Sequence, residues 1–196
     1  MAFGIRGVIM ISSKAELKKL ISEEMSVYGL NKRNIREKRY RHNKNYMIFK
    51  AIESLRIYEY WCVKRDNCKN GIPKKFYSFM VKSADRKKNI CCEKVDIELS
   101  PFMIRKNVRI CHDNVVVFGE IGENCVFHGN NVVGNKRTGA STEIPKIGNN
   151  VDIGFGAMII GNVTIADNCV IGAGAVVTKS CEKEGSVLVG VPAKTI

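Results

Sequence analysis

The sequence predicts a mainly β protein, a parallel β-helix preceded by an α-helical domain, on two observations. The first is a six-residue period in the C-terminal half, where a bulky aliphatic or aromatic residue opens each block. The blocks begin at Ile121, Phe127, Ile147, Ile153, Ile159, Ile165 and Ile171. The second is the Gly and Asn residues that recur inside the blocks, because these residues tolerate the left-handed backbone needed at corners. An α-helix has a period of 3.6 and an ordinary strand a period of 2, so a strict six predicts coils of three short strands with the bulky residues stacked inside.

The N-terminal domain, residues 1–94, is predicted to be helical. Ser13 and Glu16 have the spacing of a capping box, which opens a helix that Gly29 would end. Apolar residues at three- and four-residue spacings predict a longer helix over about residues 46–69, and a third helix is expected over about 74–88. We expect residues 1–9 to be an extension, because Met10 looks like a more natural start.

The β-helix is predicted over residues 95–196, with two breaks in its period. Ile104, Ile110 and Val116 keep the six-residue step, and Ile121 then arrives one residue early. The step from Val133 to Ile147 is 14 residues, so eight additional residues leave the repeat. An excursion from so regular a repeat indicates a functional loop.

The positive charge is confined to the N-terminal half. Residues 1–95 contain 23 Lys and Arg against 9 Asp and Glu, whereas residues 96–196 contain 9 against 10. The densest run is 32–44, with seven cations and one acid. It fits either an anionic surface, such as a lipid or a phosphorylated carrier, or an ordinary solvated helix face. No zinc-finger, helix-turn-helix or RNA-binding motif occurs, so no nucleic-acid partner is expected.

The cysteines indicate a reducing cytoplasm rather than a disulfide framework. Cys125 and Cys169 occupy the inward fifth position of their blocks, where a thiol behaves as a small hydrophobe. Cys91 and Cys92 are adjacent, and no CxxC pair suits zinc, so no metal is expected. No stretch has the ~18–20 apolar residues that a membrane span needs.

Histidine is the first place to look for a catalytic base. His42 lies in the basic run and is expected at the surface; His128 takes a corner position, in a structural or a chemical role. His112 lies where the repeat is irregular, and Asp96 precedes it by 16 residues. Since one coil is 18 residues and coils stack at ~4.8 Å, Asp96 is expected beside the imidazole of His112.

Several segments resemble the hexapeptide-repeat acyltransferases, specifically the serine acetyltransferases and their polysaccharide-locus relatives. Asp96-Ile97 and Arg109-Ile-Cys-His112 are similar to the Asp and His segment of that family. The segments similar to its coenzyme A-binding coils and tail are Ile153-Gly-Phe-Gly-Ala, Ile171-Gly-Ala-Gly-Ala-Val-Val and Val189-Gly-Val-Pro-Ala-Lys194. The resemblance implies a left-handed helix, a homotrimer or dimer of trimers, and active sites shared between subunits.

The resemblance also implies direct transfer of acetyl from acetyl-CoA to a hydroxyl, without a metal. His112 would be the general base and Asp96 would fix its tautomer. A backbone N–H near Gly134 would stabilise the oxyanion. The residues implied to contact the coenzyme along the coils and at its phosphates are Phe155, Ala173, Lys179 and Lys194.

Two departures from the family's pattern leave the acceptor open. Cys111 stands where the family usually has Asp before the catalytic His, and Glu143 stands where its Arg would pair with the serine carboxylate. We therefore take Cys111 and Glu143 as substrate-binding candidates. Serine and a sugar hydroxyl of a surface polysaccharide are both open as acceptors. A non-catalytic oligomeric scaffold is the alternative from another class.

Overall fold

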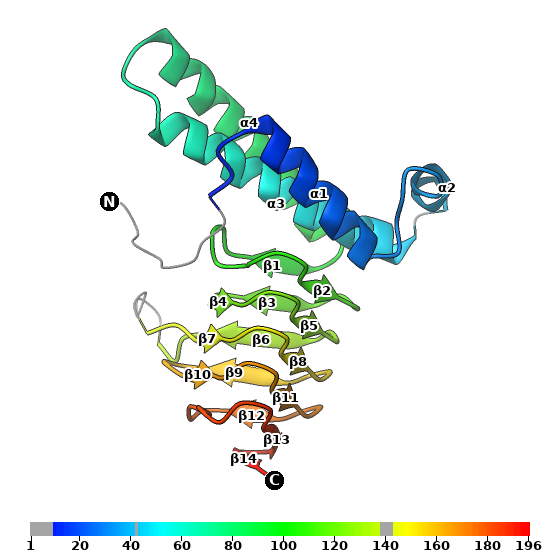
Figure 1. Ribbon diagram of the computed structural model, residues 1–196, viewed down its shortest axis with the longest axis vertical. Coiled ribbons are helices and arrows are strands. Elements are labelled where there is room, and N and C mark those ends of the chain that lie inside the picture. Colours follow the sequence, from blue (N-terminus) through cyan, green and yellow to red (C-terminus); the bar gives the residue numbers. More distant parts are fainter. Residues whose placement is uncertain (1–9, 42, 138–142) are drawn as a thin grey trace.

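Four helices cover one end of a β-helical prism in the computed structural model, which describes residues 10–41, 43–137 and 143–196 (Figure 1). The helices are α1 (Lys14–Val27), α2 (Ile35–Tyr40), α3 (Lys44–Asp66) and α4 (Ile72–Glu93). The capping box predicted for α1 is present, with the Ser13 hydroxyl accepting the Glu16 N–H at 3.1 Å. The third predicted helix is longer than expected, because Pro73 fits the first turn of α4 and nothing interrupts it before Lys94. No helix of these three ranges combines the length and apolar character of a membrane span.

The prism consists of three parallel sheets that the chain visits in turn. Sheet A contains β1 (Ile97–Leu99), β3 (Val115–Val117), β6 (Asn131–Gly134), β9 (Met158–Ile160) and β12 (Val176–Val177). Sheet B contains β4 (Glu120–Ile121), β7 (Lys146–Ile147) and β10 (Thr164–Ile165). Sheet C contains β2 (Arg109–Ile110), β5 (Val126–Phe127), β8 (Asp152–Ile153), β11 (Val170–Ile171), β13 (Val187–Gly190) and the antiparallel β14 (Ala193–Thr195). The predicted left-handed parallel β-helix is thereby confirmed.

Stacked aliphatic residues fill the prism, one column for each sheet. The sheet C column is Ile110, Phe127, Ile153, Ile171 and Leu188, and the sheet A column is Leu99, Val117, Val133, Ile159 and Val177. The prediction that Val116 belongs to the column is wrong, because Val117 points inward and Val116 is half-buried on the outer face. The true steps are seven residues from Ile110 to Val117 and four from Val117 to Ile121.

The corners confirm the role expected of Asn and Gly. At the corner between sheets B and C, four asparagines with φ between 55° and 61° stack on one another. Their carboxamides form a ladder, Asn107 to Asn124 at 3.2 Å, Asn124 to Asn150 at 3.1 Å and Asn150 to Asn168 at 3.0 Å. Each asparagine thus accepts a left-handed backbone and bonds the next coil with its side chain.

A buried charge cluster joins the helices to the first coil. Arg56 of α3 is 1% exposed and bonds Glu24 of α1 at 2.8 Å and Glu59 at 3.1 Å. The same guanidinium donates to the carbonyls of Ile104 at 2.8 Å and Arg105 at 2.7 Å. All N–H donors of the guanidinium therefore have an acceptor, which a buried guanidinium requires.

Candidate active site

The turn that contains His112 lies on the edge where the chain passes from sheet C to sheet A, here called the C–A edge. Backbone hydrogen bonds stack the turns of this edge: Asn130 donates to Asp113 at 3.0 Å, Gly156 to Gly129 at 2.9 Å and Gly174 to Phe155 at 2.9 Å. The successive positions Asp113, Gly129, Phe155 and Ala173 therefore form one line down the prism, with His112 at its upper end.

The turn at His112 holds one residue more than the turn below it. Ile110 and Val117 are seven residues apart, whereas Phe127 and Val133, the equivalent pair one coil down, are six apart. The additional residue leaves His112 exposed to solvent. Its ring faces the ring of Phe155 edge-on, with centroids 6.4 Å apart.

Gly129 provides the space that His112 occupies. A Cβ at residue 129 would lie 2.5 Å from the His112 Cβ and 3.3 Å from the Phe155 ring, and the φ of Gly129 is +119°. Glycine is therefore needed here for both contact and backbone reasons.

Asn131 holds this turn from inside the prism. It is fully buried and accepts the Gly129 N–H at 2.9 Å, while its amide donates to the carbonyls of Gly154 at 2.8 Å and Ala157 at 3.2 Å. Sequence reasoning missed it, although a signal existed. The fifth position of the other blocks is Cys, Val or Ala, so a polar residue there marks a turn that needs support from the core.

Asp96 lies one coil above the turn of His112, level with Asn114, which is two residues after His112. Its carbonyl accepts the Val115 N–H at 3.2 Å, and its φ of 51° matches the corner residue Asn114 at φ 57°. Among the described residues, no hydrogen bond joins the carboxylate of Asp96 to the imidazole of His112. The pairing of these two side chains stays a prediction.

Two ion pairs flank the edge. Asp113 bonds Lys44, the first residue of α3, at 2.9 Å, and this hydrogen bond holds the pKa of the Asp113 carboxyl below its usual range. One coil lower, His128 Nε2 lies 2.8 Å from Asp152 Oδ1. The first pair connects the helices to the turn of His112, and the second gives His128 a carboxylate partner.

The other predicted site residues lie elsewhere on the prism. Cys111 is half-buried in the His112 turn, and Ala173 is exposed two coils below Gly129. Gly134, Glu143 and Lys179 lie on the edge between sheets A and B, the A–B edge, where the long insertion also leaves the prism. Lys194 is in β14, opposite Val189 at the end of sheet C. Residues 138–142 of the insertion, and His42, lie outside the described residues.

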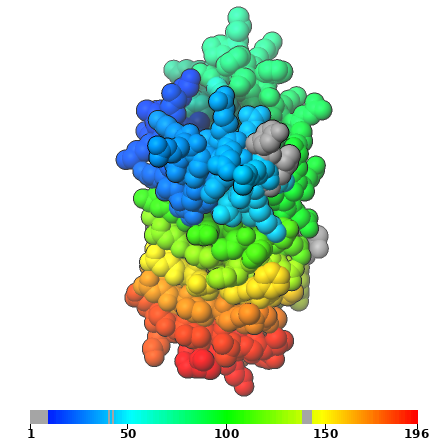
Figure 2. Space-filling view, turned by 90° about the vertical axis from the view of Figure 1, so that its right-hand side faces the viewer, coloured from blue at the N-terminus to red at the C-terminus, as the bar shows by residue number. Residues whose placement is uncertain are grey.

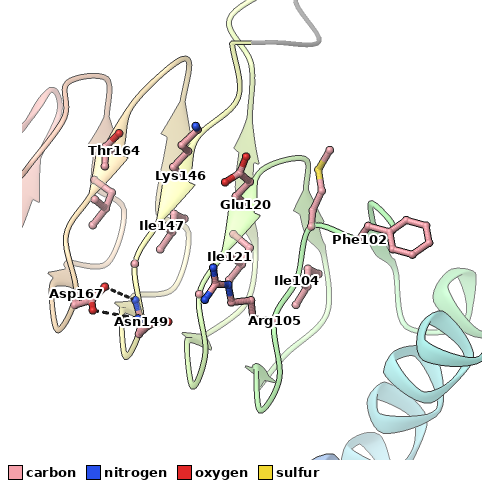
Figure 3. Close-up of a pocket in the computed structure, with 14 residues that line it drawn as sticks. Phe102, Ile104, Arg105, Glu120, Ile121, Lys146, Ile147, Asn149, Thr164 and Asp167 are labelled. Atoms are coloured by element: carbon pink, nitrogen blue, oxygen red, sulfur yellow. Dashed lines mark hydrogen bonds between the residues drawn. The ribbon is translucent and has the colours of Figure 1, made fainter. Parts of the chain in front are cut away.

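A hollow of about 310 Å³ runs along sheet B (Figure 3). Glu120, Lys146 and Thr164 are among the residues that line it. Asp167 accepts two hydrogen bonds from Asn149, at 2.7 and 3.1 Å, in the same lining. None of the described site candidates lines this hollow, because it follows a different face from the C–A edge. Within the described ranges, no cluster of three or more His, Cys, Asp or Glu side chains has a metal-binding arrangement.

Comparison with known proteins agrees with this architecture. Residues 144–179 match the family described as bacterial transferase hexapeptide (six repeats). The serine acetyltransferase of Synechococcus elongatus is 32% identical over 104 residues, which cover 51% of this chain and 42% of that relative. The chain thus spans about half the length of the curated relatives it matches.

Solved serine acetyltransferases share the fold. The enzyme from Neisseria gonorrhoeae aligns with 93% of this chain and 67% of its own, at 21% identity and a TM-score of 0.63. The Brucella abortus enzyme in complex with coenzyme A aligns with 93% and 68%, at 23% identity and a TM-score of 0.60. The chain therefore contains a segment of bacterial transferase hexapeptide repeats and has the left-handed β-helix fold of the solved serine acetyltransferases, and about half of it is similar in sequence to curated serine acetyltransferases.

Proposed function

We propose that the protein is an O-acetyltransferase that moves acetyl from acetyl-CoA to a hydroxyl, with His112 as general base. The observation that carries this proposal is the C–A edge, where the exposed His112 stands at the head of a line formed by Gly129, Phe155 and Ala173. An exposed imidazole at the head of an accessible edge is what a base needs next to an extended substrate.

The C–A edge fits the arm of a coenzyme. Gly174 is exposed and no atom lies within 4 Å of a Cβ placed there, and the ring of Phe155, 53% exposed, offers an apolar contact. With coils stacked at ~4.8 Å, the path from His112 down to Ala173 is roughly 14 Å long. Acetyl-CoA would supply a thioester whose thiolate is a good leaving group, and Lys194 at the lower end of sheet C would meet its phosphates.

The chemistry assigned to this chain is a single proton transfer in each direction. The His112 imidazole takes the acceptor's hydroxyl proton as that oxygen bonds the acetyl carbon, and the carbon–sulfur bond breaks. The imidazolium then returns the proton to the departing thiolate. Asp96 acts in this proposal by hydrogen-bonding the other ring nitrogen, which requires the two side chains to move together from the positions described above.

We assign the complete site to two chains of a homotrimer. The predicted residues divide between two edges of the prism, with His112 on the C–A edge and Gly134, Glu143 and Lys179 on the A–B edge. One chain cannot bring both edges together, whereas the C–A edge of one copy can face the A–B edge of the next. The Gly134 N–H would then stabilise the oxyanion beside the neighbouring copy's His112.

Serine and sugar hydroxyls remain the two acceptor classes. Similarity to serine acetyltransferases favours serine. The exposed Glu143 carboxylate, in the place where the family's arginine is expected, disfavours a carboxylate-bearing acceptor and so favours a sugar. All eight cysteines are free thiols, which suits our assignment to the reducing cytoplasm.

The test is coenzyme A release from acetyl-CoA with L-serine and with free and nucleotide-linked sugars. We expect His112→Ala to lower kcat at least a hundredfold, because general-base catalysis contributes about 10²–10⁴. His128→Ala is the matched control, since His128 lies on the same face and already pairs with Asp152. Full activity of His112→Ala on every acceptor would exclude His112 as the base, and no turnover at all in the wild type would favour the scaffold.

Mixed oligomers test the shared site. Two substitutions should each inactivate the protein. His112→Ala removes the base, and Gly134→Pro removes the backbone N–H of residue 134. Refolding the two inactive variants together should restore part of the activity, because some interfaces then carry an intact His112 and an intact residue 134. No recovery from a mixture shown to contain mixed trimers would refute the assignment to two chains.

A further inference from the structure

Part of the basic run lines an open hollow at the surface, and its arginines are exposed to solvent there. A hollow of about 1670 Å³ lies between α2, the start of α3 and the end of α4, here called the basic cavity. The cations that line it are Arg33, Arg36, Arg39, Lys50 and Lys94. They come from α2 and the turn before it, from α3 and from the residue that follows α4, and they border one space, which a merely solvated helix face would not do.

The cations of the basic cavity are poorly neutralised by the protein. Glu37 is the only acid among the described residues of its lining, and that carboxylate lies 3.4 Å from Arg41. Lys50 pairs with Glu53, and among the described residues no carboxylate lies within ion-pair distance of Arg33, Arg36, Arg39 or Lys94. Burial, followed by the positive charges of Lys87 and Arg39, lowers the pKa of Lys50. An anion in the cavity would relieve this repulsion.

The remaining lining is apolar. Tyr46, Met47 and Cys91 contribute to the cavity and are half-buried. Guanidinium groups bind phosphate in a bidentate manner, and an exposed apolar floor suits an uncharged ring or chain. The lining therefore fits a molecule with phosphate groups and an uncharged part. Its concave shape fits a small molecule better than a flat lipid surface.

The basic cavity adjoins the C–A edge. Lys44 begins the helix that carries Tyr46, Met47 and Lys50, and Lys44 bonds Asp113, the neighbour of His112 in sequence. Lys44 and Lys50 are roughly 9 Å apart along the helix axis. On the other side, Lys94 precedes Asp96 by two residues. Figure 2 shows the light-blue and cyan segment of α2 and early α3 directly above the green first coils.

Building on the acetyl transfer proposed above, we propose that the basic cavity binds phosphate groups of the acceptor. The acceptor is then a phosphorylated hydroxyl compound, such as a sugar phosphate or a nucleotide-linked sugar, and not a free amino acid. Its phosphates lie among the arginines of α2 and its hydroxyl reaches His112 at the top of the C–A edge. This assignment gives the charge of the N-terminal half a role in choosing the substrate.

The first experiment compares acceptors that differ only in phosphate. Coenzyme A release is measured with L-serine and with a panel of sugars, each presented free, as its 1-phosphate and as its uridine diphosphate conjugate. We expect the best phosphorylated acceptor to have a kcat/KM at least tenfold above that of the same sugar without phosphate. Inorganic pyrophosphate should inhibit competitively against that acceptor and not against acetyl-CoA, which separates the basic cavity from the coenzyme's own phosphate contacts.

The second experiment removes charge from the basic cavity. Arg36→Ser/Arg39→Ser should raise KM for the phosphorylated acceptor at least tenfold and leave kcat and the KM for acetyl-CoA within about twofold. Lys74→Ser/Lys75→Ser is the matched control, because it removes the same charge from the opposite end of α4. Circular dichroism and thermal unfolding of both variants verify that each remains folded.

The outcomes separate this inference from the function on which it rests. Turnover with serine alone, or equal turnover of free and phosphorylated sugars, leaves acetyl transfer standing and overturns the phosphate assignment. Equal KM values in the two double variants overturn it as well. Loss of binding to anionic lipid vesicles or to RNA in the Arg36→Ser/Arg39→Ser variant, with acceptor kinetics unchanged, overturns it in favour of a docking surface. If no acceptor yields coenzyme A, the proposed function fails and this inference with it.

Discussion

Replacing Gly129 with alanine should disable the site while leaving the prism folded. The added Cβ would lie 2.5 Å from the Cβ of His112, whereas ordinary van der Waals contact begins at 3.4 Å, so the two atoms must separate by about 1 Å. His112 is the side that can give way, because it is exposed and its turn holds one residue more than the turn below. Gly129 cannot retreat, since Asn131 bonds its N–H from within the core.

Two costs follow from this geometry. A displacement of about 1 Å in a catalytic group is associated with losses of around 10²-fold, so we expect kcat to fall by about two orders of magnitude. The backbone φ of +119° is close to a region that only glycine populates freely, which adds roughly 1–3 kcal/mol of destabilisation.

The assay measures coenzyme A release together with urea unfolding for Gly129→Ala and for Gly185→Ala. Gly185 also has a positive φ, +68°, but no atom lies within 4 Å of a Cβ placed there. The control should therefore lose stability and keep its activity. The reasoning is refuted if Gly129→Ala retains kcat within about twofold, or if Gly185→Ala loses as much activity.

Three further predictions concern the contacts that hold the first coil. Arg56→Met leaves the buried carboxylates of Glu24 and Glu59 unpaired and should lower the free energy of unfolding by about 3–5 kcal/mol; a loss below about 1 kcal/mol in urea unfolding contradicts it. Tyr28→Phe leaves the buried Ile110 N–H without its acceptor and should cost about 1–3 kcal/mol, against no change for Tyr77→Phe as control. The ion pair of Lys44 with Asp113 lowers the pKa of Asp113 in the folded state. Its contribution to the free energy of unfolding, at most about 1 kcal/mol for an exposed pair, is therefore present above pH ~4 and is lost as the pH falls. The stabilities of wild type and Lys44→Met should therefore converge at low pH, and a constant difference from pH 6 to 3 contradicts this.

The prism could be predicted well from the sequence because every coil imposes the same requirements on its residues. Each inward position must be apolar and each corner must accept a left-handed backbone, so a single period specifies the inward positions of the regular coils. The same regularity caused the one misplaced column residue. A six-residue count carried from Ile110 lands on Val116, whereas the turn at His112 inserts one residue and moves the inward position to Val117.

The candidate site was only partly accessible to sequence reasoning. His112 was singled out by the irregular repeat around it and Phe155 and Ala173 by a resemblance, and the hydrogen-bond register puts these positions on one edge. Asn131 carried a local signal, a polar residue in an inward position. The contacts between the helices and the first coil had no signal in the sequence, because Tyr28 and Ile110 are 82 residues apart and no period relates them.

These contacts give the helices a direct part in shaping the site. The hydroxyl of the buried Tyr28 donates to the Val108 carbonyl and accepts the Ile110 N–H, each at 3.2 Å, which satisfies the open edge of β2. Because β2 leads directly into the turn of His112, the position of the base depends on α1 as much as on the coil beneath it. Burial raises the pKa of the Tyr28 hydroxyl, so it stays protonated and keeps donating throughout the physiological pH range. Lys44 holds the far side of the same turn through Asp113. A β-helix deprived of residues 1–94 would thus lose both anchors of the catalytic turn together with the basic cavity, and we expect it to lose acetyl transfer even where its coils remain stacked.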